Sequence, residues 1–334
     1  MRSKHAAAAV TLALVAAIAG CGESTPKRAV DARTEVLRFF ASDAPVVGLL
    51  RLGQPADLLR LNRAAAGSAT WTDLRHLVLG PLHGAGLDAV DLARLVRPVQ
   101  PIEGLDTSAL ALGAPSAAAL AVGQPLLVLA TDQSQLLSRL LHRSAASGRL
   151  RPAGSVDQAA LYRGRDSSFA VRDGVLVSAP RLVDVRAAIE RRDGDRDQQL
   201  DDHEVESLFD ELDTQGPLLA YANFAALRDA DPGLATLATD NPWIEAADRG
   251  AAAARARGRF VRIVMIVKMS RSLDPAQLPF GERPSRFDLP FAAVPFLVPH
   301  RSDLLHVALR GTTPISGWGT ASANEVRADA YVGR

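Results

Sequence analysis

Residues 169–177 read Phe-Ala-Val-Arg-Asp-Gly-Val-Leu-Val, and this stretch carries the strongest fold signal in the chain. Two apolar runs flank Asp173-Gly174, a pair that suits the positive φ angles of a tight type I′ turn. The stretch is therefore predicted to form a β-hairpin, whose two strands run antiparallel.

Further strands and helices are predicted on both sides of this hairpin. Short apolar runs indicate strands at 44–52, 108–113, 117–122, 126–131, 216–224, 260–269, 304–310 and 326–332. Helical patterns occur at 35–40, 55–66, 72–84, 87–96, 133–143 and 180–192. Asp132 is expected to cap the helix that follows it. Because hairpins and helices interleave without a regular βαβα rhythm, we expect an α+β fold with antiparallel sheet and packed helices.

The C-terminal third carries weaker signals. Ala251–Ala254, with two arginines after it, is interpreted as the end of an amphipathic helix. Residues 272–303 contain six prolines and are expected to form a long irregular loop. Ser316–Thr320 is glycine-rich and is expected to turn beside a packed tryptophan, and the strand at 326–332 is expected to close the sheet.

A common spacing of 172 residues links the two halves of the chain. The strand pattern at 44–52 returns at 216–224. The matched pairs are Pro45 and Pro217, Asp57 and Asp229, and Trp71 and Trp243. An ungapped offset shared by a strand and two helices predicts a two-fold internal repeat. The expected units are residues 43–214 and residues 215–334, the second of which includes the Pro-rich loop 272–303.

Composition excludes several classes of protein. The chain has 334 residues, of which 48% are hydrophobic, enough to fill a core, so it is not a disordered protein. Its 38 basic and 37 acidic residues nearly cancel, which argues against nucleic acid as a partner. One cysteine excludes a disulfide scaffold.

The first twenty residues have the features of a secretory signal peptide. Arg2 and Lys4 precede the uncharged, apolar run Ala6–Ala19. This run is shorter than the roughly 20 apolar residues that a membrane-spanning helix requires. It ends in Ile18-Ala19-Gly20-Cys21, which contains the only cysteine of the chain.

Ile18-Ala19-Gly20-Cys21 resembles the lipobox of bacterial lipoproteins. The resemblance implies that residues 1–20 are removed and that Cys21 receives a diacylglycerol thioether and fatty acyl chains such as palmitate. Two acyl chains suffice for stable anchoring. The partner would be membrane lipid, the location the extracytoplasmic face of the bacterial cell membrane, and residues 21–42 a lipidated tether. An ordinary cleaved signal peptide is the alternative.

The mature part resembles an uncharacterised family of secreted and membrane proteins from high-GC Gram-positive bacteria. The matching motifs are Asp43-Ala44-Pro45, Ala130-Thr131-Asp132, Arg172-Asp173-Gly174-Val175-Leu176-Val177, Ala187-Ala188-Ile189 and Leu219-Ala220-Tyr221. The family has no established activity, so the resemblance implies an architecture and no mechanism.

An acidic segment at 193–204 is the sharpest candidate for chemistry. Its carboxylates match the ligand positions of an EF-hand calcium loop at Asp193, Asp195, Asp197, Asp201 and Glu204. Gln198 stands where such a loop needs glycine for its sharp turn. The alternative is structural: Asp193 and Gly194 end one helix, and Asp201 caps the next. Calcium is thus a possible cofactor, and no other cofactor is indicated.

No catalytic motif is present in the sequence, and we expect no enzyme activity. There is no Gly-x-Ser-x-Gly elbow, phosphate loop or dinucleotide fingerprint, and the histidines lack metal-ligand spacing. We expect a non-catalytic binding or scaffolding domain in the cell envelope, acting on an unknown envelope protein or small molecule. One alternative is calcium binding through Asp193–Glu204. Another is a carrier of an apolar ligand, with the sheet as a cup and 272–303 as its lid.

Overall fold

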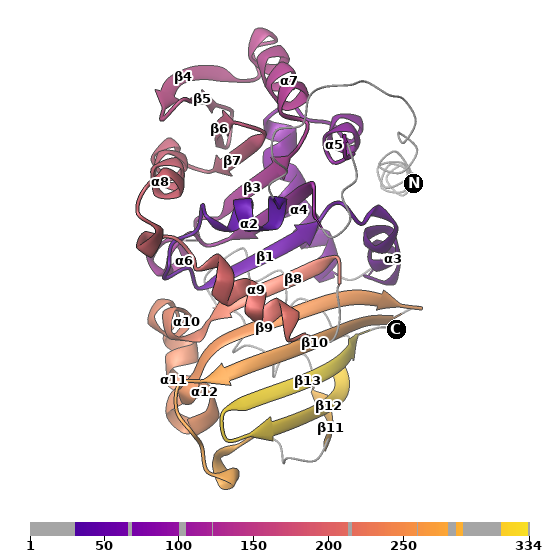
Figure 1. Cartoon of the computed structure of the whole chain (residues 1–334), viewed down its shortest axis with the longest axis vertical. Helices are drawn as coiled ribbons and strands as arrows, with labels where there is room; N and C mark the ends of the chain where they lie inside the picture. The colour runs from indigo at the N-terminus through magenta and orange to yellow at the C-terminus, as the bar shows by residue number, and fades with distance from the viewer. Residues whose placement is uncertain are drawn as a thin grey trace.

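A computed structural model describes residues 31–65, 69–99, 105–121, 123–212, 216–258, 260–279, 285–289 and 315–332. Within these ranges the strands form one antiparallel sheet in the order β11-β12-β13-β10-β9-β8-β1-β2-β3-β7-β6-β5-β4 (Figure 1). The α+β class with an antiparallel sheet is therefore confirmed.

The strands have the following bounds: β1 Val46–Arg51, β2 Ser108–Gly113, β3 Leu126–Thr131, β4 Arg151–Val156, β5 Ala159–Arg163, β6 Ser168–Arg172, β7 Val175–Ala179, β8 Leu218–Asn223, β9 Ala247–Arg257, β10 Phe260–Met269, β11 Ser285–Leu289, β12 Ile315–Ser322 and β13 Glu325–Val332. The helices are α2 Ala32–Leu37, α3 Pro55–Ala65, α4 Ala69–Gly84, α5 Ala89–Leu95, α6 Ala117–Ala121, α7 Ser134–Ala146, α8 Leu182–Asp193, α9 Asp202–Asp210, α10 Phe224–Ala230, α11 Pro232–Asp240 and α12 Pro242–Ala246. Two short 3₁₀ helices cover Arg196–Gln198 (η1) and Pro275–Gln277 (η2).

The predicted hairpin is β6–β7. Asp173 and Gly174 both have positive φ, 49° and 86°, as a type I′ turn requires. Strand β7 pairs with β6 on one side and with β3 on the other, and every residue of it is buried, because core clusters cover both of its faces. The hairpin thus lies inside the sheet.

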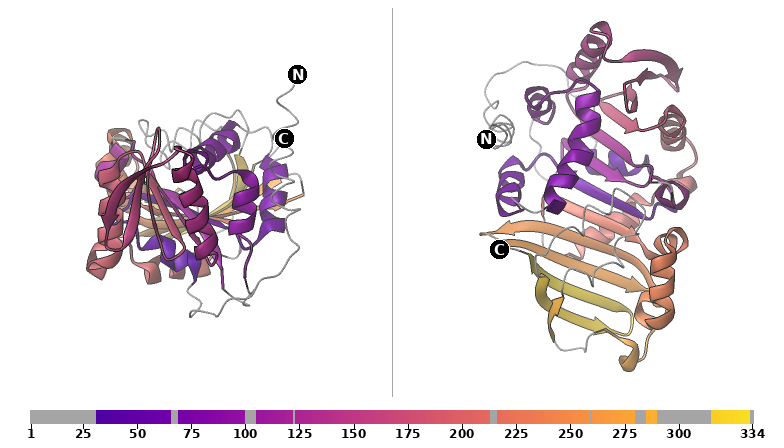
Figure 2. Two further views of the ribbon diagram at one scale, coloured as in Figure 1. Left: turned by 90° about the horizontal axis from the view of Figure 1, so that it is seen from above. Right: turned by 180° about the vertical axis from the view of Figure 1, so that it is seen from behind.

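Helices cover both faces of the first half of the sheet. We call the side that bears α2, α8 and α9 the front face and the opposite side the rear face (Figures 1 and 2). On the front face, Val36, Val185 and Val205 from these helices join one core cluster with alternate strand residues. On the rear face, α4, α5 and α7 pack on the other strand residues, such as Leu110 and Leu129. Each buried strand therefore contributes side chains to both core clusters, because successive side chains point to opposite faces of the sheet.

A third core cluster lies at one end of the central strands. Helices α6, α10, α11 and α12 gather there around Phe224 and Leu234, which are both buried. Asn223 begins α10, since its side chain accepts a hydrogen bond from the Ala226 amide at 3.1 Å.

Two expectations near the first half were wrong. Residues 117–122 form no strand: Ala117–Ala121 is helix α6, in keeping with the high helix propensity of alanine. Asp132 does not cap α7, whose N-cap is Gln133 without a side-chain bond. Asp132 instead accepts a hydrogen bond from the Val99 amide at 2.7 Å, so it anchors the chain before β2.

The C-terminal third also differs from expectation. Ala251–Ala254 lies in strand β9, paired with β8 and β10, and is not the end of a helix. Ser316–Thr320 lies in strand β12, and Trp318 is 53% exposed, so it is neither a turn nor a packed tryptophan. Strand β13 lies between β10 and β12 and does not close the sheet.

Some segments were missed and others cannot be compared. The hairpin β4–β5 was not predicted, and β11 and η2 lie within the expected loop 272–303. The strand expected at 304–310 lies outside the described residues.

Candidate functional site

The lipidation site predicted from the sequence, Cys21, lies outside the described residues. Acylation of Cys21 stays a prediction. In the part of the chain that is described, no helix combines the length and the apolar character needed to cross a bilayer.

The first residue of the acidic segment is engaged by two arginines. Asp193 is the last residue of α8, and its carboxylate pairs with Arg172 from β6 and with Arg192, whose Nη1 lies 2.6 Å away. Partial burial would raise the pKa of Asp193, but the hydrogen bonds from Arg192 and Arg172 outweigh it and hold the pKa below its usual value. The carboxylate is thus already neutralised by side chains.

Of the other predicted ligands, Asp195 and Asp201 act at helix ends, Glu204 forms an ion pair with Arg249, and Asp197 lies within η1. Asp195 accepts from the Asp197 amide at the start of η1. Asp201 caps α9 by accepting from the amides of His203 and Glu204, at 2.9 and 3.2 Å. These contacts match the structural alternative for the segment, in which the acids serve helix ends.

The acidic segment is not gathered into a metal site in this structure. Among the described residues, which include all of 193–204, no group of three or more Asp, Glu, His or Cys is placed to hold a metal ion. Binding calcium there would require Asp193 to leave its arginines. Calcium stays an untested prediction.

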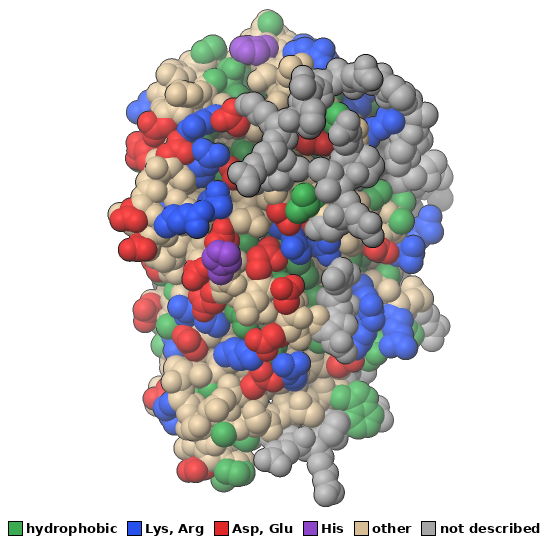
Figure 3. Space-filling view, in the orientation of Figure 1, with side chains coloured by type: hydrophobic (Ala, Val, Ile, Leu, Met, Phe, Trp, Pro, Cys, Tyr) green, Lys and Arg blue, Asp and Glu red, His purple; other side chains and the backbone are tan. Residues whose placement is uncertain are grey.

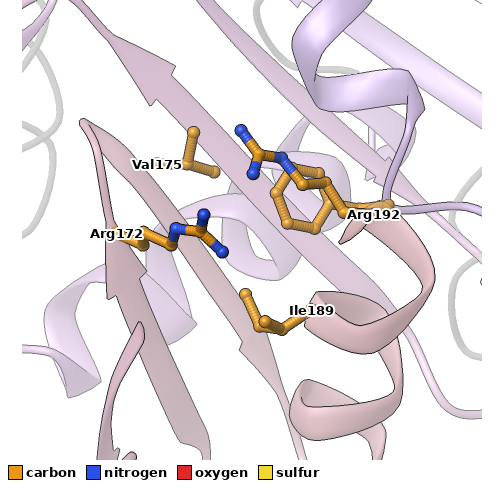
Figure 4. A pocket seen from close by; sticks show the side chains of 5 residues that line it. Arg172, Val175, Ile189 and Arg192 are labelled. Atoms are coloured by element: carbon orange, nitrogen blue, oxygen red, sulfur yellow. The ribbon is translucent and has the colours of Figure 1, made fainter. Parts of the chain in front are cut away.

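A small cavity lies beside Asp193. Its walls are Phe39, Arg172, Val175, Ile189 and Arg192, and Figure 4 shows the side chains of Arg172 and Arg192 extending toward each other near Val175 and Ile189. The cavity measures about 10 Å³, which is room for about one water molecule. It is too small for an organic ligand.

A second group of charges joins elements that are distant in sequence. Asp106, 6% exposed, accepts a hydrogen bond from Arg51 Nε at 2.7 Å, and Arg33 Nε lies 3.4 Å from the same oxygen. Arg33 Nη2 also lies 3.1 Å from Glu206. Arg33 lies in α2, Arg51 in β1, Asp106 just before β2, and Glu206 in α9. We call these four residues the central charge cluster. Burial raises the pKa of Glu206, although Arg33 opposes the shift.

Tyr221 and its neighbours form a third polar group beneath α9. Tyr221 is 1% exposed, and its hydroxyl has no hydrogen-bond partner in the described part of the chain. Burial raises the pKa of this hydroxyl, and the pKa of Glu204 is raised for the same reason. Arg249 Nε lies 3.2 Å from Glu204, so the ion pair fixes α9 to β9.

These clusters were not predicted from the sequence, because their ion pairs join residues 45 or more positions apart. Their charges are largely matched within the protein, and Figure 3 shows blue and red side chains interspersed over the front face. Such an arrangement fastens helices to the sheet.

Comparison with known proteins adds little. No protein-family model and no curated protein matches the chain. The solved structures that the chain resembles include two crystal forms of TP0453. Crystal form I of TP0453 has a TM-score of 0.42 and 10% identity, covering 91% of this chain and 93% of that one. Crystal form III has a TM-score of 0.45 and 9% identity, covering 92% and 96%. Similarity this weak carries no statement about function.

Proposed function

We propose that the chain is a lipid-anchored protein of the bacterial cell envelope whose α+β domain binds or scaffolds and does not catalyse. The observation that carries the proposal is the coincidence of a basic start, an apolar run and the only cysteine, Cys21, at its end. The internal pairing of buried charges supports the non-catalytic part of the proposal, since a catalytic acid or base needs an accessible group.

The anchor is tested with the variant Cys21→Ser, expressed in a Gram-positive host fed with labelled palmitate. The wild-type chain is expected in the membrane fraction with label attached, and the variant without label. A variant that stays in the membrane fraction and is processed as before would refute the proposal. A Ser24→Ala variant, three residues further on, is the matched control and should behave as wild type.

Carriage of an apolar ligand is the second candidate, favoured by the rear face of the second half of the sheet. There β10 presents Ile263 and Met265, both half-buried, between strands with small side chains. Ile263 pairs with Ala254 and Ala330, and Met265 pairs with Ala252 and Ala328. We call these residues the apolar sheet face. Of the described helices, α3 lies against β9 and β10.

The apolar sheet face fits an acyl chain better than a polar ligand, because rows of alanine on β9 and β13 flank the long side chains of β10 and no charged residue interrupts these rows. Neither the 10 Å³ cavity beside Asp193 nor the open, polar-lined hollow at Ser134 and Asp173 could enclose an acyl chain, and residues 280–284 and 290–303 of the expected lid lie outside the described residues.

A fluorescent fatty acid tests this candidate. Saturable binding is expected, with affinity reduced roughly tenfold in Met265→Gln, because a polar atom then lies in the apolar face. Thr320→Gln, on the front face, is the control and should bind as wild type. If Met265→Gln and Thr320→Gln bind the fatty acid equally well, the carrier function is refuted.

We also propose the two-fold internal repeat, which the strand order supports. Strands β1 and β8 are neighbours, and β1-β2-β3-β7 is mirrored by β8-β9-β10-β13. In the β1–β8 pair, Gly48 lies opposite Ala220, and these residues are 172 positions apart. An experimental structure tests the repeat: one rotation should superpose the two units with residues 172 apart aligned. Alignment at another offset would contradict it.

A further inference from the structure

Arginines gather at one end of the strands in the second half of the sheet. The β9–β10 register places Arg255 directly opposite Arg262, and Arg257 follows on the same face of β9. Like charges that face each other across a strand pair are destabilising. No acidic residue occurs in the sequence between Arg249 and Lys268, so the β9–β10 hairpin does not neutralise these side chains itself.

Helix α3 brings two more arginines to the same edge. It packs against β9 and β10 and lies beside the end of β9 in both ribbon views (Figures 1 and 2). Arg60 and Arg63 of α3 are exposed. Figure 3 shows blue side chains at this edge, where β9 ends. We call the following residues the arginine edge: Arg60, Arg63, Arg255, Arg257 and Arg262.

The acids near the arginine edge are already engaged. Arg262 holds Asp329 with two hydrogen bonds, from Nε to Oδ1 at 2.8 Å and from Nη2 to Oδ2 at 2.6 Å. Asp57 lies 3.6 Å from Arg60 on the same helix. The acids of the central charge cluster pair with the arginines of that cluster. None of these carboxylates is therefore left to neutralise the other arginines of the edge.

Three arginines of the edge keep an uncompensated charge. In the described part of the chain, Arg63, Arg255 and Arg257 have no carboxylate within ion-pair distance. Arg257 donates a hydrogen bond to the Tyr331 hydroxyl at 3.0 Å, but a phenol is neutral near pH 7. A group of unpaired, outward-facing guanidinium groups attracts anions, and phosphate suits their forked geometry best.

The described chain begins at the same edge of the sheet. The Ala32 amide donates to the Asp106 carbonyl at 2.8 Å, and Asp106 accepts from Arg51, the last residue of β1. Strands β1 and β9 end on the same side, because both run antiparallel to β8, which lies between them. Two strand spacings separate them, roughly 10 Å. Asp31 thus enters the domain close to the arginine edge.

This position limits how far the arginine edge can lie from an anchored Cys21. The ten residue steps from Cys21 to Asp31 span at most about 36 Å. If Cys21 carries acyl chains in the bilayer, the edge of the domain where the chain enters is held near the lipid head groups.

We infer that the arginine edge docks the domain onto an anionic membrane surface by contact with phospholipid phosphates. The charge of the edge is complementary to such a surface, and the length of the tether holds the two together. The inference rests on the proposed lipid anchor, and it specifies how the anchored domain is oriented.

The experiment uses the acylated full chain, reconstituted in phosphatidylcholine vesicles with or without phosphatidylglycerol. Ala56→Cys places a thiol for a fluorescent label at an exposed position of α3, four residues before Arg60 and so on the same side of the helix. Nitroxide-labelled lipid head groups quench the label where α3 contacts the bilayer. Quenching is expected to be several-fold stronger with phosphatidylglycerol, and high salt should remove the difference, because salt screens exposed charges.

Arg255→Gln combined with Arg257→Gln should reduce quenching to the level of neutral vesicles, since each arginine near an anionic surface favours binding roughly fivefold. Lysine at both positions keeps the charges and should restore quenching. The matched control is Arg151→Gln combined with Arg163→Gln, which neutralises another opposed pair, on β5 and the far edge strand β4. It should be quenched as wild type. Thermal unfolding confirms that each variant is folded.

Two results would overturn the inference: equal quenching with and without phosphatidylglycerol, or unchanged quenching when Arg255 and Arg257 are replaced by glutamine. Soluble poly(glycerol phosphate) is the rival probe. Binding of this polymer through Arg255 and Arg257, without quenching in anionic vesicles, would also overturn it, in favour of a soluble polyanion. Flotation with neutral vesicles reports the anchor separately. A chain that floats but is not quenched refutes the arginine edge alone, whereas a chain that does not float refutes the anchor and the inference together.

Discussion

Single residues in the interior of this protein are constrained by the backbone as much as by side chains. Gly174 has a φ of +86°, and a Cβ atom there would collide with the carbonyl oxygen of Thr131. The Gly174 carbonyl in turn accepts a hydrogen bond from the Thr131 amide at 3.0 Å. The turn of the β6–β7 hairpin is thereby fastened to the end of β3.

Gly174→Ala is expected to destabilise the protein by about 1–3 kcal/mol, because strain at positive φ is added to a backbone collision. Urea unfolding measures the loss. Gly154→Ala is the matched control: φ at Gly154 is +98°, but nothing lies within 4 Å of the added Cβ. If the two variants lose the same stability, the collision with Thr131 is unimportant.

Glu206→Gln is expected to change how stability depends on pH. Burial raises the pKa of Glu206 in the folded state above its ordinary value of 4.5. Between pH 4.5 and that raised value the folded protein binds more protons than the unfolded chain, so this group makes stability fall as the pH rises. Denaturation of wild type and variant from pH 4.5 to 7.5 compares the slopes. The variant should decline less with rising pH, and parallel curves would contradict the assignment.

Tyr221→Phe is expected to leave stability unchanged or to raise it by about 1 kcal/mol, since it removes a buried hydroxyl without a described hydrogen-bond partner. Melting temperature is the readout. Tyr162→Phe is a comparison at another buried tyrosine on β5. A large loss of stability in Tyr221→Phe would show that the hydroxyl is hydrogen-bonded in solution.

At the scale of elements, the same residue type adopts different structures according to its neighbours. Ala117–Ala121 is a helix, whereas the alanines of β9 are extended between β8 and β10. Intrinsic propensity favours a helix for both runs. The two flanking strands override that propensity in β9, because each supplies a ladder of backbone hydrogen bonds.

Asp201→Ala is expected to destabilise the protein by about 0.5–2 kcal/mol, because it removes the cap of α9. Thermal unfolding with and without millimolar calcium is the measurement. Asp197→Ala is the control within the same segment, since no helix is capped by the Asp197 side chain in the described structure. A rise in wild-type melting temperature with calcium, lost in both variants, would instead support the calcium alternative.

At the scale of the whole molecule, one sheet joins both halves of the chain. Strand β1 of the first half pairs with β8 of the second, and the front core includes Val47 and Leu49 together with Leu219 and Tyr221. Helices α2 and α9 lie over this junction, tied by the Arg33–Glu206 ion pair. The two halves therefore share one hydrophobic core at the junction between β1 and β8.

Leu49→Ala and Leu219→Ala are each expected to lower stability by about 2–5 kcal/mol, since both side chains are buried at the junction. In each variant the whole described domain should still unfold in one cooperative transition, at a lower temperature or denaturant concentration than in wild type. Hydrogen exchange can follow β3 and β10 separately. If Leu49→Ala weakens protection of β3 alone and leaves β10 unchanged, the halves unfold independently and the expectation is wrong. Val183→Ala, at an exposed site on α8, should alter neither strand.

Local sequence was sufficient for the elements whose signals are local. The Asp173-Gly174 turn, the strands β1, β3 and β10, and the helices α3, α4 and α8 were all predicted, because turn chemistry and hydrophobic periodicity depend on neighbouring residues. The role of Asp201 as a cap was predicted as an alternative for the same reason.

Only the tertiary structure decided which partners each element has. The sequence does not predict that β13 lies inside the sheet or that the alanines of β9 are extended. It also does not predict that Asp193 forms ion pairs with two arginines. Nor does it bring Arg63 and Arg255 to one edge of the sheet. Strand order and ion pairing depend on contacts between residues far apart in the chain, and a single sequence holds no record of those distances.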